Sequence, residues 1–140
     1  MTQEMELTKQ ILCKKDATCV IYKDGKSALS NERGVSPLIL WLEEEEKPLA
    51  GAHVADKVIG KAAALLMIYA GVREVYAGVI SEPAARCFEA YQIPYCFGQM
   101  TARIANRAGT GLCPMEELCM EIDDPKRAYQ ALKNKLQGKQ

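Results

Sequence analysis

The fold is decided by residues 53–100, which read HVADKVIGKAAALLMIYAGVREVYAGVISEPAARCFEAYQIPYCFGQM. The first part, residues 53–71, is apolar on almost every side between Val58 and Tyr69, which is typical of a helix buried on most of its surface. Gly71 suits the left-handed residue that ends such a helix. The segment continues as a strand (EVYAGVI), a helix that starts at proline (PAARCFEAYQ) and a second strand (IPYCFGQM). This order, with short connections, predicts a right-handed crossover between two parallel strands.

The segment before residue 31 predicts a helix followed by a β-hairpin. Residues 3–15 space their apolar side chains as a short amphipathic helix does. Asp24-Gly25 then lies between two short apolar runs, and this pair of residues favours a type I′ turn because both can adopt positive φ angles. We therefore expect two antiparallel strands, at about residues 19–22 and 27–30.

Further helices are expected outside these segments. Residues 36–46, SPLILWLEEEE, predict a helix with Ser36 as its cap and the acidic run as its solvated end. Residues 101–112 carry two glycines and little periodicity and are expected to form a loop, after which CPMEELC and DDPKRAYQALKNKLQ predict two helices. The sequence thus predicts one α/β domain over residues 1–140, with a mixed sheet of at least four strands flanked by helices.

Composition limits the class of function. Apolar residues make up 49% of the 140 residues, and 18 basic side chains balance 18 acidic ones, so bulk charge gives no reason to expect binding to nucleic acid or to a membrane surface. The start of the chain has no basic segment followed by an apolar one, and no apolar run reaches the roughly 18 residues that a membrane span needs. The six cysteines form no CxxC pair, which favours reduced thiols in a cytoplasmic protein.

Residues 81–87, SEPAARC, mark the place where a ligand would bind. Ser81 suits the cap of the following helix, Glu82 places a favourable charge in its first turn, and Pro83 suits its first position. The same residues lie at the carboxyl end of a predicted parallel strand. In open α/β sheets ligands bind in the crevice outside such strand ends.

Two short patterns in this region resemble the zinc-dependent cytidine deaminase superfamily. In that superfamily a hairpin precedes a helix with H-A-E or C-A-E, and a strand then delivers E-P-C-x-x-C at the start of the next helix. Residues 82–87, EPAARC, match the second pattern with Ala84 in place of the first cysteine, and residues 59–61, IGK, stand about where H-A-E would fall. The resemblance covers a little over half of the chain and implies a three-layer α/β/α cytidine deaminase-like mixed sheet with an N-terminal hairpin.

The same comparison argues against zinc chemistry. A catalytic zinc site needs three protein ligands and an open position, and only Cys87 remains at the expected places. The glutamate that shuttles protons is missing too. A site rebuilt from His53, Cys87 and Cys113 is the alternative that we weigh against this interpretation. We predict no metal, no cofactor and no zinc-dependent deamination.

Three longer segments, ADKVIGKAAALLMIYAGV, VISEPA and IANRAGTGLCPMEE, resemble the prokaryotic family DUF1893. The known structure of that family is similar to a cytidine deaminase fold without the zinc motif, and no activity is established for the family. The resemblance implies the fold and the position of a site, and both agree with the interpretation of the residues above.

The predicted long helix carries two lysines near its start. Lys57 and Lys61 are four residues apart and would share one face of that helix, next to Asp56. A lysine on a buried helix needs a partner, because an unpaired buried ammonium is costly. Lys61 could bind an anionic ligand, pair with Asp56 or Glu82, or extend outward to solvent. Gly60 would allow close packing against the sheet or the close approach of a ligand.

Two further segments could reach the same crevice. Cys113 is expected to cap the helix that starts at Pro114, where the N-terminal dipole can lower the pKa of a thiol and make it nucleophilic; the alternative is a small buried cysteine in a tight turn. Glu116 lies in the first turn of that helix. In the preceding loop, at Asn106-Arg107, the Arg107 side chain could clamp a phosphate or carboxylate; the alternative is that Arg103 and Arg107 only form surface ion pairs.

Three hypotheses of function follow. The first is a deaminase-fold protein that has lost zinc and binds a small anionic or nucleotide-like ligand. The second is a zinc-independent enzyme with Cys113 as nucleophile, assisted by Lys61 or Glu116. The third is a regulatory or interaction subunit that forms a homo-oligomer. The candidate site residues are Asp56, Lys57, Lys61, Ser81, Glu82, Asn106, Arg107, Cys113 and Glu116.

Overall fold

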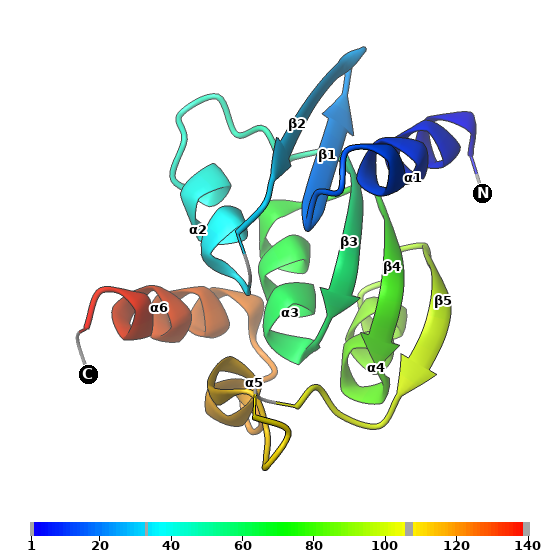
Figure 1. The fold of residues 1–140 in the computed structure, drawn as a ribbon. Coiled ribbons are helices and arrows are strands. Elements are labelled where there is room, and N and C mark those ends of the chain that lie inside the picture. The colour runs from blue at the N-terminus through cyan, green and yellow to red at the C-terminus, as the bar shows by residue number, and fades with distance from the viewer. Residues whose placement is uncertain (1, 33, 106–107, 139–140) are drawn as a thin grey trace.

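The computed structural model of the chain describes residues 2–32, 34–105 and 108–138. Its centre is one five-stranded sheet with the strand order β2-β1-β3-β4-β5 (Figure 1). Both β2 and β3 run antiparallel to β1, whereas β3, β4 and β5 run parallel to one another, so the sheet is mixed as predicted. The strands are β1 (Cys19–Lys23), β2 (Lys26–Ser30), β3 (His53–Ile59), β4 (Glu74–Ser81) and β5 (Tyr95–Thr101).

Helices cover both faces of this sheet (Figure 1). On one face α1 packs on β1 and β3 through a small apolar cluster that includes Met5, Val20 and Ala55. On the other face α3 packs against its neighbouring helices over the main apolar core, to which the fully buried Leu65 and Phe88 belong. The helices are α1 (Gln3–Lys14), α2 (Ser36–Leu42), α3 (Lys61–Ala70), α4 (Glu82–Ala90), α5 (Pro114–Cys119) and α6 (Pro125–Leu136).

The predicted hairpin is confirmed. Asp24 and Gly25 have φ angles of 52° and 80°, which are the positive values that a type I′ turn requires at its two central residues. The strands pair from Lys23 with Lys26 outward to Cys19 with Ser30. The sequence signal worked because a two-residue turn is a local property of the backbone.

The single long helix predicted over residues 53–71 is wrong in its first half. His53–Ile59 forms β3, and the helix begins only at Lys61, after Gly60 in extended conformation with φ of −100° and ψ of −176°. β3 lies between β1 and β4, and α1 and α3 pack on it, so Val54, Ala55 and Ile59 are fully buried as residues of a helix core would be. An apolar run of this kind cannot be assigned from periodicity alone. Gly71 does end the helix, with φ of 81°.

This correction separates the two lysines. Lys57 lies on β3, and its Nζ forms an ion pair with Asp16 Oδ1 at 3.0 Å, next to α1. Lys61 is the first residue of α3. Lys57 therefore does not share a helix face with Lys61, as the sequence had led us to expect.

Two smaller expectations concern helix ends and membranes. The cap of α2 is Val35, without a side-chain hydrogen bond, and Ser36 is already its first helical residue, so Ser36 does not have the predicted role. Within residues 2–32, 34–105 and 108–138, no helix has the length and apolar character to cross a membrane.

Candidate functional site

The candidate site lies at the carboxyl ends of β3 and β4. The two strands are parallel and end side by side, with Ile59 paired to Ile80. Each leads directly into a helix, β3 into α3 through Gly60 and β4 into α4 through Ser81 (Figure 1). The N-termini of α3 and α4 therefore open on the same edge of the sheet, which is where the sequence placed the crevice.

The N-terminus of α4 is capped by the side chain of the residue just before it, Ser81. Ser81 is fully buried, and its Oγ accepts a hydrogen bond from the backbone N–H of Ala84 at 3.2 Å. Glu82 and Pro83 occupy the first turn, as predicted. Ala84, which takes the place of the first cysteine in the sequence pattern E-P-C-x-x-C, is also fully buried. The stretch SEPAARC thus has a structural role in capping α4.

The N-terminus of α3 is capped by a side chain from a distant part of the sequence. Gly60 offers no side chain as a cap. Instead the Glu116 carboxylate, brought by α5, accepts two hydrogen bonds: Oε1 from Lys61 N–H at 2.7 Å and Oε2 from Ala62 N–H at 2.8 Å. Glu116 is only 8% exposed, and a side chain at Gly60 would overlap its carboxylate. Gly60 is therefore required for the approach of this carboxylate, which neither alternative from the sequence foresaw.

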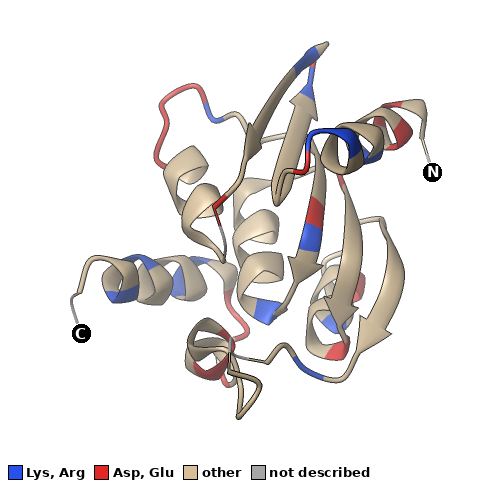
Figure 2. Ribbon diagram, viewed as in Figure 1, with Lys and Arg blue, Asp and Glu red and all other residues tan. Residues whose placement is uncertain are grey.

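Lys61 is held by the segment between α5 and α6. Its Nζ donates to Asp123 Oδ1 at 2.8 Å and to the Met120 carbonyl at 3.1 Å, and its side chain is 12% exposed. This hydrogen bond and the Lys61 charge lower the pKa of Asp123. Figure 2 shows acidic residues in this segment beside the start of α3. The partner of Lys61 is thus Asp123, and neither Asp56 nor Glu82, the two candidates from the sequence.

Thiols near Lys61 are held in their neutral form. Burial, followed by the Glu116 carboxylate, raises the pKa of Cys119 to about 12 against the opposing effect of Lys61. Burial also raises the pKa of Cys87, which Lys61 again lowers in part. Neither thiol is therefore a nucleophile at neutral pH, since the thiolate is the reactive form.

Cys113 is the N-cap residue of α5, as predicted. Its N–H donates to the Ile104 carbonyl at 3.0 Å and its carbonyl accepts from Glu117 N–H at 2.9 Å, while its side chain makes no capping hydrogen bond. The role of Cys113 as a nucleophile stays a prediction. Asn106 and Arg107, the remaining candidates from this loop, lie outside the described residues.

Asp56 is buried within the sheet. It lies on β3 opposite Cys19 of β1, is 8% exposed, and its Oδ1 accepts from Val58 N–H at 3.2 Å. Burial raises the pKa of Asp56 from 3.8 to about 7, although hydrogen bonds from Val58 and Cys19 act in the opposite direction. A carboxyl group with a pKa near neutrality is unusual and often marks functional sites.

Comparison with known proteins now identifies the family. A family model described as TM1506, a domain of unknown function (DUF1893), matches residues 7–136. The chain belongs to the DUF1893 family. Its structure is similar to the crystal structure of a DUF1893 family protein (TM1506) from Thermotoga maritima, with a TM-score of 0.86 and 28% identity over 96% of this chain and 92% of the other. No curated protein matches the chain.

The geometry of this DUF1893 protein argues against the rebuilt metal site. His53 begins β3, so it is about 20 Å along the strand from Gly60 and the start of α3. Its Nδ1 lies 2.8 Å from Glu74 Oε2, to which Thr2 also donates at 2.7 Å. His53 therefore cannot join Cys87 and Cys113. Among the described residues, no group of three or more His, Cys, Asp or Glu side chains could hold a metal ion.

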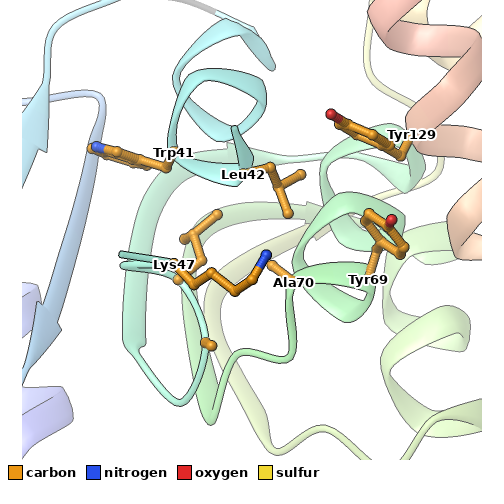
Figure 3. A pocket seen from close by; sticks show the side chains of 8 residues that line it. Trp41, Leu42, Lys47, Tyr69, Ala70 and Tyr129 are labelled. Carbon is orange, nitrogen blue, oxygen red and sulfur yellow. The ribbon is translucent and has the colours of Figure 1, made fainter. Parts of the chain in front are cut away.

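Two cavities lie at the opposite end of the sheet. One of about 420 Å³ is bounded by the last turns of α2 and α3 and by α6, and Figure 3 shows the Lys47 side chain extending into it below Leu42 and near Ala70. Tyr69 stacks on Tyr129 there with ring centroids 5.1 Å apart. The other, of about 410 Å³, includes Glu74 and Cys96 in its lining. Neither cavity includes any residue of the sequence-predicted site.

Sequence reasoning did not identify Asp123 of the DUF1893 chain as a site residue. It named Glu116 but missed that Glu116 caps α3. One signal for each was present. A lysine at the start of an apolar helix requires an acidic partner, and a helix that starts after glycine requires an acceptor from elsewhere. Nothing local, however, says which of the 18 acidic residues supplies either group.

Proposed function

We propose that this DUF1893 protein binds a small anionic ligand, such as a nucleotide or another phosphorylated metabolite, at the carboxyl ends of β3 and β4. The ligand's anionic group would take the place of the Glu116 carboxylate on the Lys61 and Ala62 N–H groups. The observation that carries the proposal is the double hydrogen bond from these two N–H groups to a carboxylate at 2.7 and 2.8 Å.

That arrangement has the chemistry of an anion site. Backbone N–H groups at a helix N-terminus, together with the helix dipole, bind carboxylates and phosphates in many proteins. α3 is ten residues long, its cap position has no side chain, and the Lys61 ammonium lies at the same helix end. An external phosphate would thus meet two donors and a positive charge.

The Glu116 carboxylate, which accepts hydrogen bonds from these N–H groups, belongs to the short helix α5. α5 has six residues and follows a connection from β5 whose described part contains only an isolated β-bridge, between Ala105 and Leu112. The side chain of Asp123, which also contacts Lys61, is 90% exposed. Opening of α5 would expose the Lys61 and Ala62 N–H groups and release the Lys61 ammonium together. The apparent affinity for a ligand is then the intrinsic affinity multiplied by the fraction of molecules in which α5 has moved away from the start of α3.

The architecture in which we place this site is a cytidine deaminase-like sheet without zinc. Three features support it: the hairpin that precedes β3, the residues Ile59-Gly60-Lys61 at the start of α3, and the residues Ala84 to Cys87 in the first turns of α4. In this account the crevice keeps its place at the helix N-termini while its chemistry changes from metal-assisted hydrolysis to the binding of an anion.

The test is a binding screen on matched variants. Inorganic phosphate, nucleoside mono- and triphosphates and phosphorylated sugars are titrated by calorimetry and thermal shift into the wild type, Glu116→Gln and Glu117→Gln. Glu117 is the exposed neighbour on α5 and serves as the control. At least one ligand should bind, more tightly to Glu116→Gln than to the other two, and Lys61→Ala should weaken it. Absence of binding to all three proteins, or affinity that ignores both Glu116 and Lys61, would sink the proposal.

A further inference from the structure

We infer that the free edge of β5 is an interface for a second copy of this chain. Two β5 strands would pair antiparallel about a two-fold axis at Gly98 and join two five-stranded sheets into one. This inference rests on backbone geometry and charge at the edge of the sheet, and it is independent of the ligand proposed above.

β5 is an exposed edge without the usual protection. It is the last strand of the sheet, and Figure 1 shows no described element beyond it. Phe97 is 41% and Met100 39% exposed. Natural edge strands discourage pairing with lysine, proline or a bulge, and β5 (YCFGQMT) contains neither residue and pairs with β4 in one continuous register. The opposite edge strand, β2, begins with Lys26.

The backbone of β5 shows which groups are available. Val75 N–H donates to the Pro94 carbonyl at 3.0 Å, so Pro94 directs its carbonyl toward β4. Because N–H and C=O groups alternate in direction along a strand, Cys96, Gly98 and Met100 also bond toward β4. The remaining residues of β5 direct their N–H and C=O groups to the free edge; these are Tyr95, Phe97, Gln99 and Thr101.

A two-fold axis at Gly98 makes this edge complementary to itself. Phe97 then lies opposite the partner's Gln99, and Tyr95 opposite the partner's Thr101. In an antiparallel ladder each such pair exchanges two hydrogen bonds, so all four outward residues are satisfied by about eight bonds. Gly98 falls at the close, non-hydrogen-bonded position on the axis, opposite the partner's Gly98.

Charge also fits this pairing. Residues 90–102 carry no charged side chain, in a chain in which 26% of residues are charged, and β5 is free of charge in Figure 2. No like charges would therefore face each other across the axis. The first charged residues beyond this run are Glu89 before the strand and Arg103 after it. With the axis at Gly98, Arg103 falls opposite the partner's uncharged Ile93, so no like charge faces it in the ladder.

The first test is the oligomeric state of matched proline variants. Gln99→Pro removes an N–H that faces the free edge and leaves the ladder to β4 intact, whereas Ser27→Pro makes the same change at an outward position of β2. Light scattering after size exclusion should find a dimer for the wild type and Ser27→Pro and a monomer for Gln99→Pro with unchanged circular dichroism. A monomeric wild type, or a dimer that survives in folded Gln99→Pro, overturns the inference.

A second measurement fixes the register and does not depend on the proline variants. The axis at Gly98 places Cys96 opposite the partner's Met100, at a distance that a disulfide can span. In a Cys13→Ser background, mild oxidation of Met100→Cys should give a covalent dimer through Cys96. Thr101→Cys, whose side chain points to the other face of the sheet, should not do so. Equal cross-linking of the two variants, or none in either, contradicts this pairing.

Discussion

Replacement of Asp56 by asparagine removes a carboxyl group whose ionisation the fold opposes. Asp56 is 8% exposed and has Val58 N–H and the Cys19 thiol as hydrogen-bond donors. Burial nevertheless dominates and raises its pKa from 3.8 to about 7. Asparagine has nearly the same shape and keeps an oxygen for Val58 N–H, so the variant isolates the effect of the charge.

The sign of the pH dependence follows from proton linkage. Between pH 3.8 and about 7 the folded protein binds a proton at Asp56 that the unfolded chain has lost, so stability falls as pH rises through this window. The stabilising contribution is fully present below 3.8 and is lost above about 7. The gap between these two pKa values corresponds to about 4 kcal/mol.

The assay is urea unfolding at a series of pH values between pH 4 and 8. The free energy of unfolding of Asp56→Asn relative to the wild type should increase by several kcal/mol across the window. Asp16→Asn, in which the lost carboxylate is 94% exposed, should run parallel to the wild type. Parallel profiles for Asp56→Asn and the wild type would refute the reasoning, because Asp56 would then have an ordinary pKa.

Three further predictions concern single residues. Glu116→Gln weakens two charge-assisted hydrogen bonds to the start of α3 and should lower the free energy of unfolding by about 2 kcal/mol. The control Glu117→Gln changes an exposed side chain and should alter it by less than about 0.5 kcal/mol. Equal losses in the two variants would speak against the capping role of Glu116. Gly71→Ala places a side chain at φ of 81° and should lower stability by about 1 kcal/mol in the same assay; an unchanged value would mean that the helix end relaxes. If Cys113 is an activated nucleophile, iodoacetamide should modify it at lower pH than the exposed Cys13, whereas identical pH profiles with a midpoint of about 8.5 would remove that hypothesis.

The parts of the fold that the sequence predicted correctly depend on local chemistry. The Asp24-Gly25 turn, the Ser81 cap and the Gly71 helix end each follow from one or two residues whose backbone preference decides the outcome. Sequence order also sufficed for the parallel pair β4 and β5, because a helix with short connections between two strands leaves few topologies.

The failures have a common physical origin in contacts between distant segments. Whether residues 53–59 form a helix or a strand depends on β1 and β4, which bond to both sides of β3. Glu116 and Asp123 are 55 and 62 positions away from Lys61, and no spacing in the sequence connects them. A candidate site at the starts of α3 and α4 therefore stays a prediction from the sequence, while its contacts with Glu116 and Asp123 could be found only in three dimensions.

The central claim is that the Lys61 and Ala62 N–H groups form an anion site that Glu116 occupies. The most direct measurement is a phosphate titration followed by the amide resonances of these two residues in the wild type and in Glu116→Gln, at constant ionic strength. We predict that both resonances shift and saturate in Glu116→Gln at a lower phosphate concentration than in the wild type. Resonances that stay unmoved in Glu116→Gln, or that respond alike in the two proteins, would contradict the account.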